Sequence, residues 1–231
     1  MPQPRPKPFA LDSSGAPDRE RNESPSNGGG PALATRLTVW REDRVARQAL
    51  RIAGEPNLVL DLPCGNGRYW PMLTRHPNRL VLAADDPADS LARPRSTHGV
   101  EIAERICVLH TPRFAIDLGE NAVDAIFCMR FLHRLESTQQ RLDVLREFHR
   151  VTRDTLIISL WVDGNYQAWR RKRVDRRRAT AAPSGRKPSR FVVPREQIED
   201  EFNSVGFNIL SHLDLLPGFA MWRVYVLRKT S

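Results

Sequence analysis

A short glycine-containing turn and a later aspartate are the residues of this chain best suited to bind a nucleoside. The turn DLPCGNG at residues 61–67 follows a short apolar run, and Asp85 ends the next apolar run. Gly65 and Gly67 have no Cβ, so the backbone can bend tightly there and a ligand can approach it closely. An acid at the end of the second strand can accept hydrogen bonds from a ribose diol.

Two common nucleotide-binding motifs are absent from this turn. A dinucleotide-binding turn reads G-x-G-x-x-G, but no third glycine stands at the required offset after Gly65 and Gly67. The phosphate-binding pattern G-x-x-x-x-G-K-[ST] is also missing. The turn therefore predicts a nucleoside ligand that is neither a typical dinucleotide nor a nucleoside triphosphate.

Three segments resemble class I S-adenosylmethionine-dependent methyltransferases. DLPCGNG at 61–67 is similar to the family's motif I, LVLAADDPADSL at 80–91 to its second-strand segment, and NAVDAIFCMRFLHRL at 121–135 to its fourth-strand segment. Later elements also match, so the resemblance covers about residues 36–231. It implies an α/β, Rossmann-like three-layer fold with a seven-stranded, mostly parallel sheet and an antiparallel last strand pair.

The resemblance implies S-adenosylmethionine as the cofactor. By this resemblance, the residues of the turn would surround the methionine part of the cofactor, and Asp85 would hold its ribose hydroxyls. The end of the fourth strand would lie beside cofactor and acceptor. Pro63 replaces the family's usual first glycine, and the acid that often contacts adenine aligns near Pro112. The implied cofactor-binding residues are Asp61, Pro63, Cys64, Gly65, Gly67, Asp85, Cys128, Met129 and Arg130.

Short apolar runs alternate with helical segments along the rest of the chain, which predicts an α/β domain with a buried, mostly parallel sheet. An amphipathic helix carries Leu142, Leu145 and Phe148, and another helix ends before Gly206. The expected strands cover residues 58–62, 80–84, 106–109, 123–128, 155–161, 207–213 and 222–227.

Composition predicts one domain preceded by a tail. Residues 1–34 are rich in Pro, Gly, Ser and Asn and predict a disordered tail, while residues 35–231 form the methyltransferase domain with an Arg-rich insertion at 169–190. The N-terminus has no apolar segment typical of a secretory signal, and no apolar run approaches the roughly 18 residues of a membrane span. The three cysteines form neither a disulfide framework nor a zinc pattern, so we expect a cytoplasmic protein without a metal site.

The positive charge is concentrated in one segment. Residues 170–190 hold ten Lys or Arg and one acid, Asp175, which accounts for the whole net charge of +9. Guanidinium groups suit bidentate phosphate contacts. The segment is either an anion-binding surface or a solvated helix face followed by a loop. The candidate anion-binding residues are Arg170, Arg171, Arg173, Arg176 and Arg177.

Three residues near the ends of the fourth and fifth strands are candidates for catalysis. Asp163 and Tyr166 follow the fifth strand and can act as a base or as positioning groups. His133 is a candidate base because an imidazole ordinarily titrates near neutral pH. Each also has a structural interpretation: Asp163 as a turn residue before Gly164, and His133 as a packed residue at the start of a helix.

Three kinds of anionic partner remain open: RNA, an acidic membrane surface that the protein contacts peripherally, and a phosphorylated glycolipid. The segments SLWVDGNYQAWRRKR and RFVVPR are similar to small bacterial methyltransferases that accompany lipopolysaccharide-kinase-like proteins. That resemblance implies an acceptor on a phosphorylated, lipopolysaccharide-related envelope glycolipid or polysaccharide, with such a kinase-like protein as a partner. The alternatives are an RNA methyltransferase and a non-catalytic anion-binding adaptor on a degenerate methyltransferase fold.

Overall fold

The computed structural model describes residues 33–85, 98–180 and 190–230. From residue 39 onward the described residues form one compact unit, which contains every strand of the described chain. Residues 1–32 of the predicted tail and residues 181–189 of the predicted insertion lie outside the described residues.

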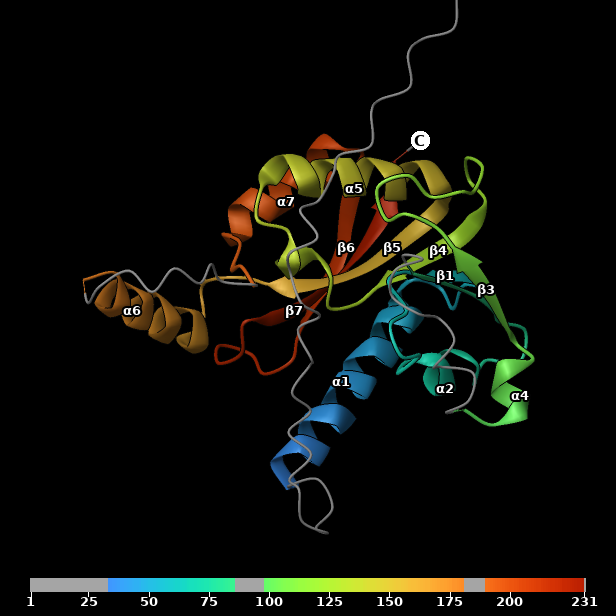
Figure 1. Cartoon of the computed structure of the whole chain (residues 1–231), viewed down its shortest axis with the longest axis horizontal. Helices are drawn as coiled ribbons and strands as arrows, with labels where there is room; N and C mark the ends of the chain where they lie inside the picture. The colour runs from blue at the N-terminus through green and yellow to red at the C-terminus, as the bar shows by residue number, and fades with distance from the viewer. Residues whose placement is uncertain (1–32, 86–97, 181–189, 231) are drawn as a thin grey trace, which may run out of the picture. The chain divides into compact units, whose positions relative to one another are not determined.

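Seven strands form one sheet in the described part of the chain (Figure 1). They are β1 (Leu58–Asp61), β2 (Leu80–Asp85), β3 (Ile106–His110), β4 (Val123–Cys128), β5 (Thr152–Trp161), β6 (Phe207–Asp214) and β7 (Trp222–Lys229). Their order is β3-β2-β1-β4-β5-β7-β6. Strands β1 to β5 pair in parallel, and β7 pairs antiparallel with both β5 and β6. The predicted fold class, with an antiparallel last strand pair, is therefore confirmed.

Helices connect these strands, as the alternation of apolar runs predicted. They are α1 (Leu33–Ile52), α2 (Trp70–Leu73), α4 (Val100–Ala103), α5 (Thr138–Val151), α6 (Tyr166–Thr180) and α7 (Arg195–Ser204), with a 3-10 turn η1 (Leu132–Arg134). Gly54 and Gly206 follow α1 and α7 with positive φ, a conformation in which helices commonly end, and Gly206 was predicted as such a stop. Among the described residues, none of the helices has the length and apolar character that a membrane crossing requires.

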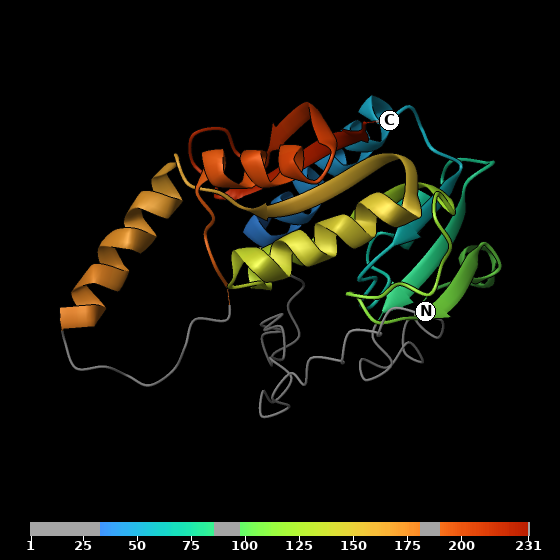
Figure 2. The same cartoon turned by 90° about the horizontal axis from the view of Figure 1, so that it is seen from above.

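Both faces of the sheet are buried, because side chains on a strand alternate between them. In β4, Ile126 and Cys128 pack with α5 and α7 on one face, and Ala125 and Phe127 pack with α1 and α2 on the other. Figure 1 and Figure 2 show these helices on opposite sides of the sheet. Burial on both faces explains why the strands read as continuous apolar runs.

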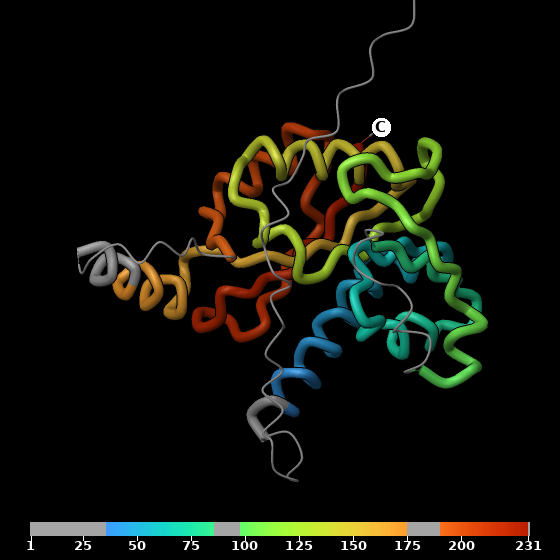
Figure 3. Tube along the Cα trace, viewed as in Figure 1, coloured from blue at the N-terminus to red at the C-terminus, as the bar shows by residue number. Residues whose placement is uncertain are grey.

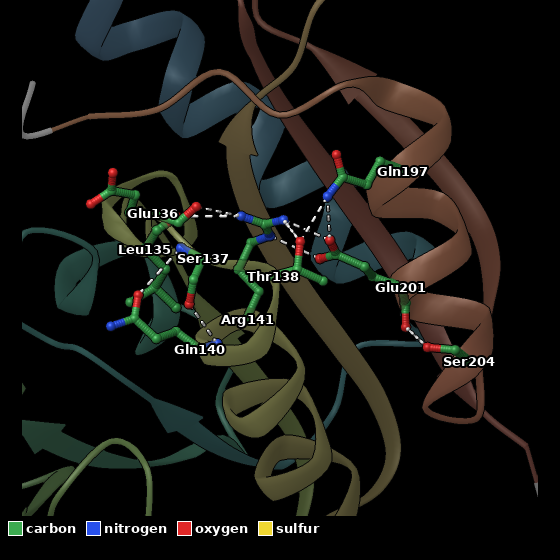
Figure 4. A network of polar contacts seen from close by, with 9 residues as sticks. All are labelled: Leu135, Glu136, Ser137, Thr138, Gln140, Arg141, Gln197, Glu201 and Ser204. Atoms are coloured by element: carbon green, nitrogen blue, oxygen red, sulfur yellow. Dashed lines mark hydrogen bonds and ion pairs between the residues drawn. The ribbon is translucent and has the colours of Figure 1, made fainter. Parts of the chain in front are cut away.

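A buried ion pair fixes α5 against α7 (Figure 4). Arg141 donates from Nε to Glu201 Oε2 at 2.8 Å and from Nη2 to Glu201 Oε1 at 2.6 Å, a bidentate geometry. Ser137 and Gln140 form a capping box at the start of α5. Arg141 also donates to the carbonyl of Glu136. These contacts hold the connection between β4 and α5, which contains η1.

Candidate functional site

The glycine turn lies where the order of strands reverses, between β1 and β4. The backbone N–H of Leu62 donates to the carbonyl of Phe127 in β4 at 3.1 Å, and that of Cys64 donates to Ala84 in β2 at 2.9 Å. The turn is therefore anchored to the carboxyl ends of both neighbouring strands. In open α/β sheets this reversal point is the usual ligand-binding crevice.

Both predicted glycines have backbone conformations that favour glycine. The φ angles of Gly65 and Gly67 are 54° and 72°. A Cβ on Gly67 would lie 2.7 Å from ring carbons of Trp70, so any larger residue would displace that buried indole. Pro63, which stands where the family usually has a glycine, follows a cis peptide bond.

Asp61, the last residue of β1, is a buried carboxyl with one neutral hydrogen-bond donor. Trp70 Nε1 donates to Asp61 Oδ2 at 3.1 Å. Burial raises the pKa of Asp61 to about 8, the Trp70 hydrogen bond opposes this shift, and the charge of Asp85 adds to it. Asp61 is therefore protonated near neutral pH until a positive charge approaches it.

Asp85 links the second strand to the turn. Its Oδ2 accepts from the backbone N–H of Gly65 at 2.9 Å, and its Oδ1 accepts from Arg113 Nη2 at 2.7 Å. The Arg113 guanidinium also lies 5.4 Å from the ring centroid of Phe131. The structure thus brings Asp85 to the turn, as predicted, and adds Arg113, whose side chain was not predicted to take part.

The residues at the end of β4 are mostly packing groups. Cys128 and Met129 are buried, as is Cys64 in the turn. Burial, followed by the charge of Asp61, raises the pKa of both thiols, so they stay protonated and are poor nucleophiles. Arg130 has a φ of 60°, unusual for a residue with a side chain, and its N–H donates to Ser159 Oγ at 2.8 Å.

A buried glutamate from α1 joins two arginines at this edge of the sheet. Arg130 Nη2 donates to Glu42 Oε1 at 2.6 Å, and Arg68, which follows the glycine turn, pairs with Glu42 Oε2. The neighbouring Tyr69 is buried, and its hydroxyl has no hydrogen-bond partner among the described residues. Glu42, Arg68 and Tyr69 were not predicted, because nothing in their local sequence indicates that they meet.

Asp163, just beyond the end of β5, contacts both α6 and α7. Its Oδ1 accepts from the backbone N–H of Arg195 at the start of α7 at 3.0 Å, and its Oδ2 accepts from Lys172 Nζ in α6 at 3.3 Å. In Figure 3 the end of β5 leads directly into α6, near the start of α7. These contacts give Asp163 partners in α6 and α7, and both its role as a turn residue and its role as a base stay predictions.

Tyr166 is half-exposed in the first turn of α6. Its ring stacks on Phe219 from the β6–β7 connection, with centroids 5.5 Å apart, and its centroid lies 6.0 Å from that of Trp169. Tyr166, Trp169 and Phe219 are 49%, 56% and 46% exposed, which is unusual for large rings in mutual contact. We call these three side chains the aromatic patch.

His133 in η1 is buried and stacks on Trp161, with ring centroids 4.9 Å apart and planes at 15°. Burial, followed by the positive charges of nearby arginines, lowers the pKa of His133 to about 3. The expectation of a pKa near neutrality was wrong, because it took no account of this environment. His133 is neutral at physiological pH and a weak base. The three candidate catalytic residues have separate partners.

The arginines of the predicted anion-binding set lie in different environments. Arg171 is partly buried against Trp161, whereas Arg170 is exposed and Arg173 lies over the ring of Trp169. The side chains of Arg176 and Arg177 lie outside the described residues. Only part of the segment is therefore a solvated helix face.

A family model described as a methyltransferase domain matches residues 59–155, which include Asp61, the glycine turn, Asp85 and the end of β4. No curated protein matches the chain. The matched segment contains the predicted cofactor-binding residues and the strands that position them.

Solved structures with the same fold include enzymes of different activities. The chain is similar to magnesium protoporphyrin IX methyltransferase ChlM from Synechocystis PCC 6803, with a TM-score of 0.65 and 15% identity over 88% of this chain and 90% of that one. It is similar to the [4+2]-cyclase SpnF (TM-score 0.62, 14% identity, 81% and 80% covered). It is also similar to the mitomycin 7-O-methyltransferase MmcR (TM-score 0.64, 15% identity, 84% and 54% covered). At these identities the likeness establishes the fold.

Proposed function

We propose that this chain, an enzyme of the S-adenosylmethionine-dependent methyltransferase type, methylates a phosphorylated acceptor. The type of enzyme rests on the domain match at residues 59–155 together with the fold. The phosphorylated acceptor is our proposal and rests on the arginines at the carboxyl ends of β4 and β5.

The residues at the reversal point fit the cofactor. S-adenosylmethionine carries positive charge on its sulfonium and ammonium groups, and Asp61 is a buried carboxyl that a nearby positive charge would ionise. Asp85 is fixed by Gly65 beside the turn, where a ribose diol can donate to it. This pairing of a buried acid with an anchored acid beside a glycine turn is the observation that carries the methyl-transfer assignment.

S-adenosylmethionine supplies a methyl group on a sulfonium, which an acceptor nucleophile displaces in line as the C–S bond breaks. The contribution of the protein is mainly to hold donor and acceptor in that alignment. Because His133 is a weak base, its place in η1 favours a positioning role over proton removal.

A charged and apolar surface at α6 supports an acceptor that carries both phosphate and lipid. Arg173 is exposed and lies over the ring of Trp169 in the aromatic patch, so a cationic group and large apolar rings occupy one helix. Guanidinium groups pair well with phosphates, and aromatic rings bury readily at a membrane interface. We propose a phosphorylated, lipopolysaccharide-related envelope glycolipid or polysaccharide as the acceptor. A lipopolysaccharide-kinase-like partner that installs the phosphate would work on the same molecule.

The first test is binding of S-adenosylmethionine, measured by calorimetry on the wild type, Asp85→Ala and the control Asp143→Asn. Loss of a charge-assisted hydrogen bond to the ribose should weaken binding at least about tenfold in Asp85→Ala, or roughly 1.5–3 kcal/mol. Asp143 is exposed on α5, so its variant should bind as the wild type does. A folded wild type that binds no cofactor would instead favour the adaptor alternative.

The acceptor is tested by transfer of a labelled methyl group to envelope glycolipid extracts, before and after phosphatase treatment. Transfer that depends on the phosphate supports the proposal, and transfer to dephosphorylated material contradicts it. RNA is the second candidate, because the rings of Tyr166 and Trp169 beside Arg173 are also suited to stack bases. Methyl transfer to RNA, with binding that weakens steeply with salt, would favour that candidate.

A further inference from the structure

Two guanidinium groups converge on the indole of Trp161, the last residue of β5. The Cζ atoms of Arg171 and Arg190 lie 5.1 and 5.6 Å from the Trp161 ring centroid, and the ring of His133 stacks on the same indole. The two arginines come from opposite ends of the Arg-rich insertion, one from α6 and one from the segment that leads to α7. We call these four side chains the Trp161 cluster.

Backbone hydrogen bonds fix the positions of this cluster. Phe191 N donates to the carbonyl of His133 at 2.7 Å, and Val193 N donates to that of Trp161 at 2.9 Å. Arg171 Nη2 donates to the carbonyl of Arg190 at 2.8 Å. The cluster is therefore held by η1, β5, α6 and the returning segment together, with Arg171 half-buried and Arg190 exposed.

The electrostatic environment of the cluster is positive. Four arginines act on the buried His133, namely Arg134, Arg190, Arg130 and Arg171, and all of them disfavour its protonation. The Nδ1 atom of His133 is buried and has no hydrogen-bond partner among the described residues. Like charges that converge in a partly buried place are stabilised by a bound anion, most strongly by one that accepts several charge-assisted hydrogen bonds.

The position of the cluster relates it to the acceptor. Trp161 ends β5, and η1 follows the end of β4, so both lie at the same edge of the sheet as the glycine turn. A group bound there would stand beside β4 and β5, while a cofactor at the turn would stand beside β1 and β2. An acceptor molecule can then place its anionic group at the Trp161 cluster and its nucleophile toward the cofactor at the glycine turn.

We propose that the Trp161 cluster binds a phosphomonoester group of the acceptor, with Arg171 and Arg190 as its guanidinium donors and Trp161 as the apolar wall behind it. This inference rests on the proposed function for its link to an acceptor, but the anion site itself does not require methyl transfer. It separates Arg171 from its neighbours Arg170 and Arg173 and assigns to Arg190 a role that the sequence did not indicate.

The test is titration with inorganic phosphate and with glycerol phosphate, followed by the indole N–H signal of Trp161 in NMR spectra. The signal is assigned by its loss in Trp161→Phe. The variants Arg171→Gln and Arg190→Gln are compared with Arg170→Gln, which removes the same charge from the adjacent, exposed position. Losing a charge-assisted contact should weaken binding about tenfold or more in the first two variants, and less than about twofold in the control.

Two results would overturn the proposal: no phosphate-dependent shift of the Trp161 signal, or equal weakening by Arg170→Gln, which would mean general attraction to a basic helix. Short-chain phosphatidic acid distinguishes lipid-borne phosphate from free phosphate. Equal affinity for phosphatidic acid and glycerol phosphate would show that the site recognises the phosphate alone. Tighter binding of phosphatidic acid would show that the site also contacts the lipid. Both results support the proposed site. Failure of cofactor binding with an intact phosphate response would reject the proposed function and leave this site standing.

Discussion

Arg113 Nη2 donates to Asp85 Oδ1 at 2.7 Å, so the acid expected to hold a ribose already pairs with a guanidinium. The second carboxylate oxygen, Oδ2, accepts a hydrogen bond from the backbone N–H of Gly65 at 2.9 Å. The side chain of Asp85 is 3% exposed and that of Arg113 is 23% exposed, so the pair is largely shielded from water. The pair fixes the orientation of the carboxylate beside the turn.

This pair should contribute measurably to folding. A double-mutant cycle with Arg113→Met and Asp85→Asn should give a coupling of about 1–2 kcal/mol in the free energy of unfolding, because each single change leaves a partner group poorly satisfied. The exposed pair Arg146–Asp143, treated in the same way, should couple by less than about 0.5 kcal/mol. Urea unfolding measures both cycles. Equal couplings would mean that the Asp85 pair is as weak as a surface pair.

Cofactor binding should release a proton from Asp61. At pH 6.5 the carboxyl is protonated, because its pKa is about 8, and an α-amino group is still charged. A positive charge bound beside Asp61 lowers that pKa and expels the proton. Calorimetry in buffers of different ionisation enthalpy should therefore show the release of about one proton.

The variant Asp61→Asn is the control for this release, since its amide cannot titrate. It should bind S-adenosylmethionine without dependence on the buffer. If the wild type shows no buffer dependence either, or the variant shows the same dependence, the proton does not come from Asp61.

Asp61 should also make stability depend on pH. Its pKa is raised from 3.8 to about 8 on folding, so the folded chain holds the proton over a range in which the unfolded chain has lost it. The contribution to stability is complete below about pH 4 and is lost as the pH rises through 8, with a slope of at most about 1.4 kcal/mol per pH unit.

Urea unfolding between pH 5 and 8 should therefore show a flatter pH dependence for Asp61→Asn than for the wild type, as the linkage relation requires. The exposed Asp143→Asn should keep the wild-type slope. A wild-type stability that rises over this range would contradict the raised pKa.

The aromatic patch should bind anionic membranes. Trp169→Ala and Phe219→Ala should each reduce co-sedimentation with vesicles of phosphatidylcholine and phosphatidylglycerol several-fold, because large rings bury apolar area at the interface. Trp40→Ala removes an exposed indole from α1 instead and should have little effect. Equal loss in all three variants, or binding unaffected by phosphatidylglycerol, would contradict a specific role for the patch.

The sequence predicted the strands and the turn because their signals are local. Continuous apolar runs mark strands buried on both faces, and Gly65 and Gly67 mark a turn with positive φ. The strand β5 begins at Thr152, before the predicted residue 155, because β4 pairs with that polar start. Cross-strand pairing of this kind has no signature in a single segment.

Side-chain partnerships between distant segments were not predictable for the same reason. Glu42 pairs with Arg130, which lies 88 residues later in the chain, and Arg113 pairs with Asp85 from a loop without a motif. His133 looked like a base because an isolated imidazole titrates near neutral pH. Its burial against Trp161 and the surrounding arginines arises only from the folded arrangement.

The chain leaves the sheet after Val162 and returns beside the same residue at Val193, where the two form a parallel bridge. The Arg-rich segment between them therefore starts and ends at one point of the scaffold, and none of its described residues belongs to a strand of the sheet. Such a segment can be exchanged by a single genetic insertion or deletion while the donor half of the enzyme keeps its architecture. With the acceptor bound at the Trp161 cluster as proposed, acceptor choice and methyl donation would evolve separately in this protein.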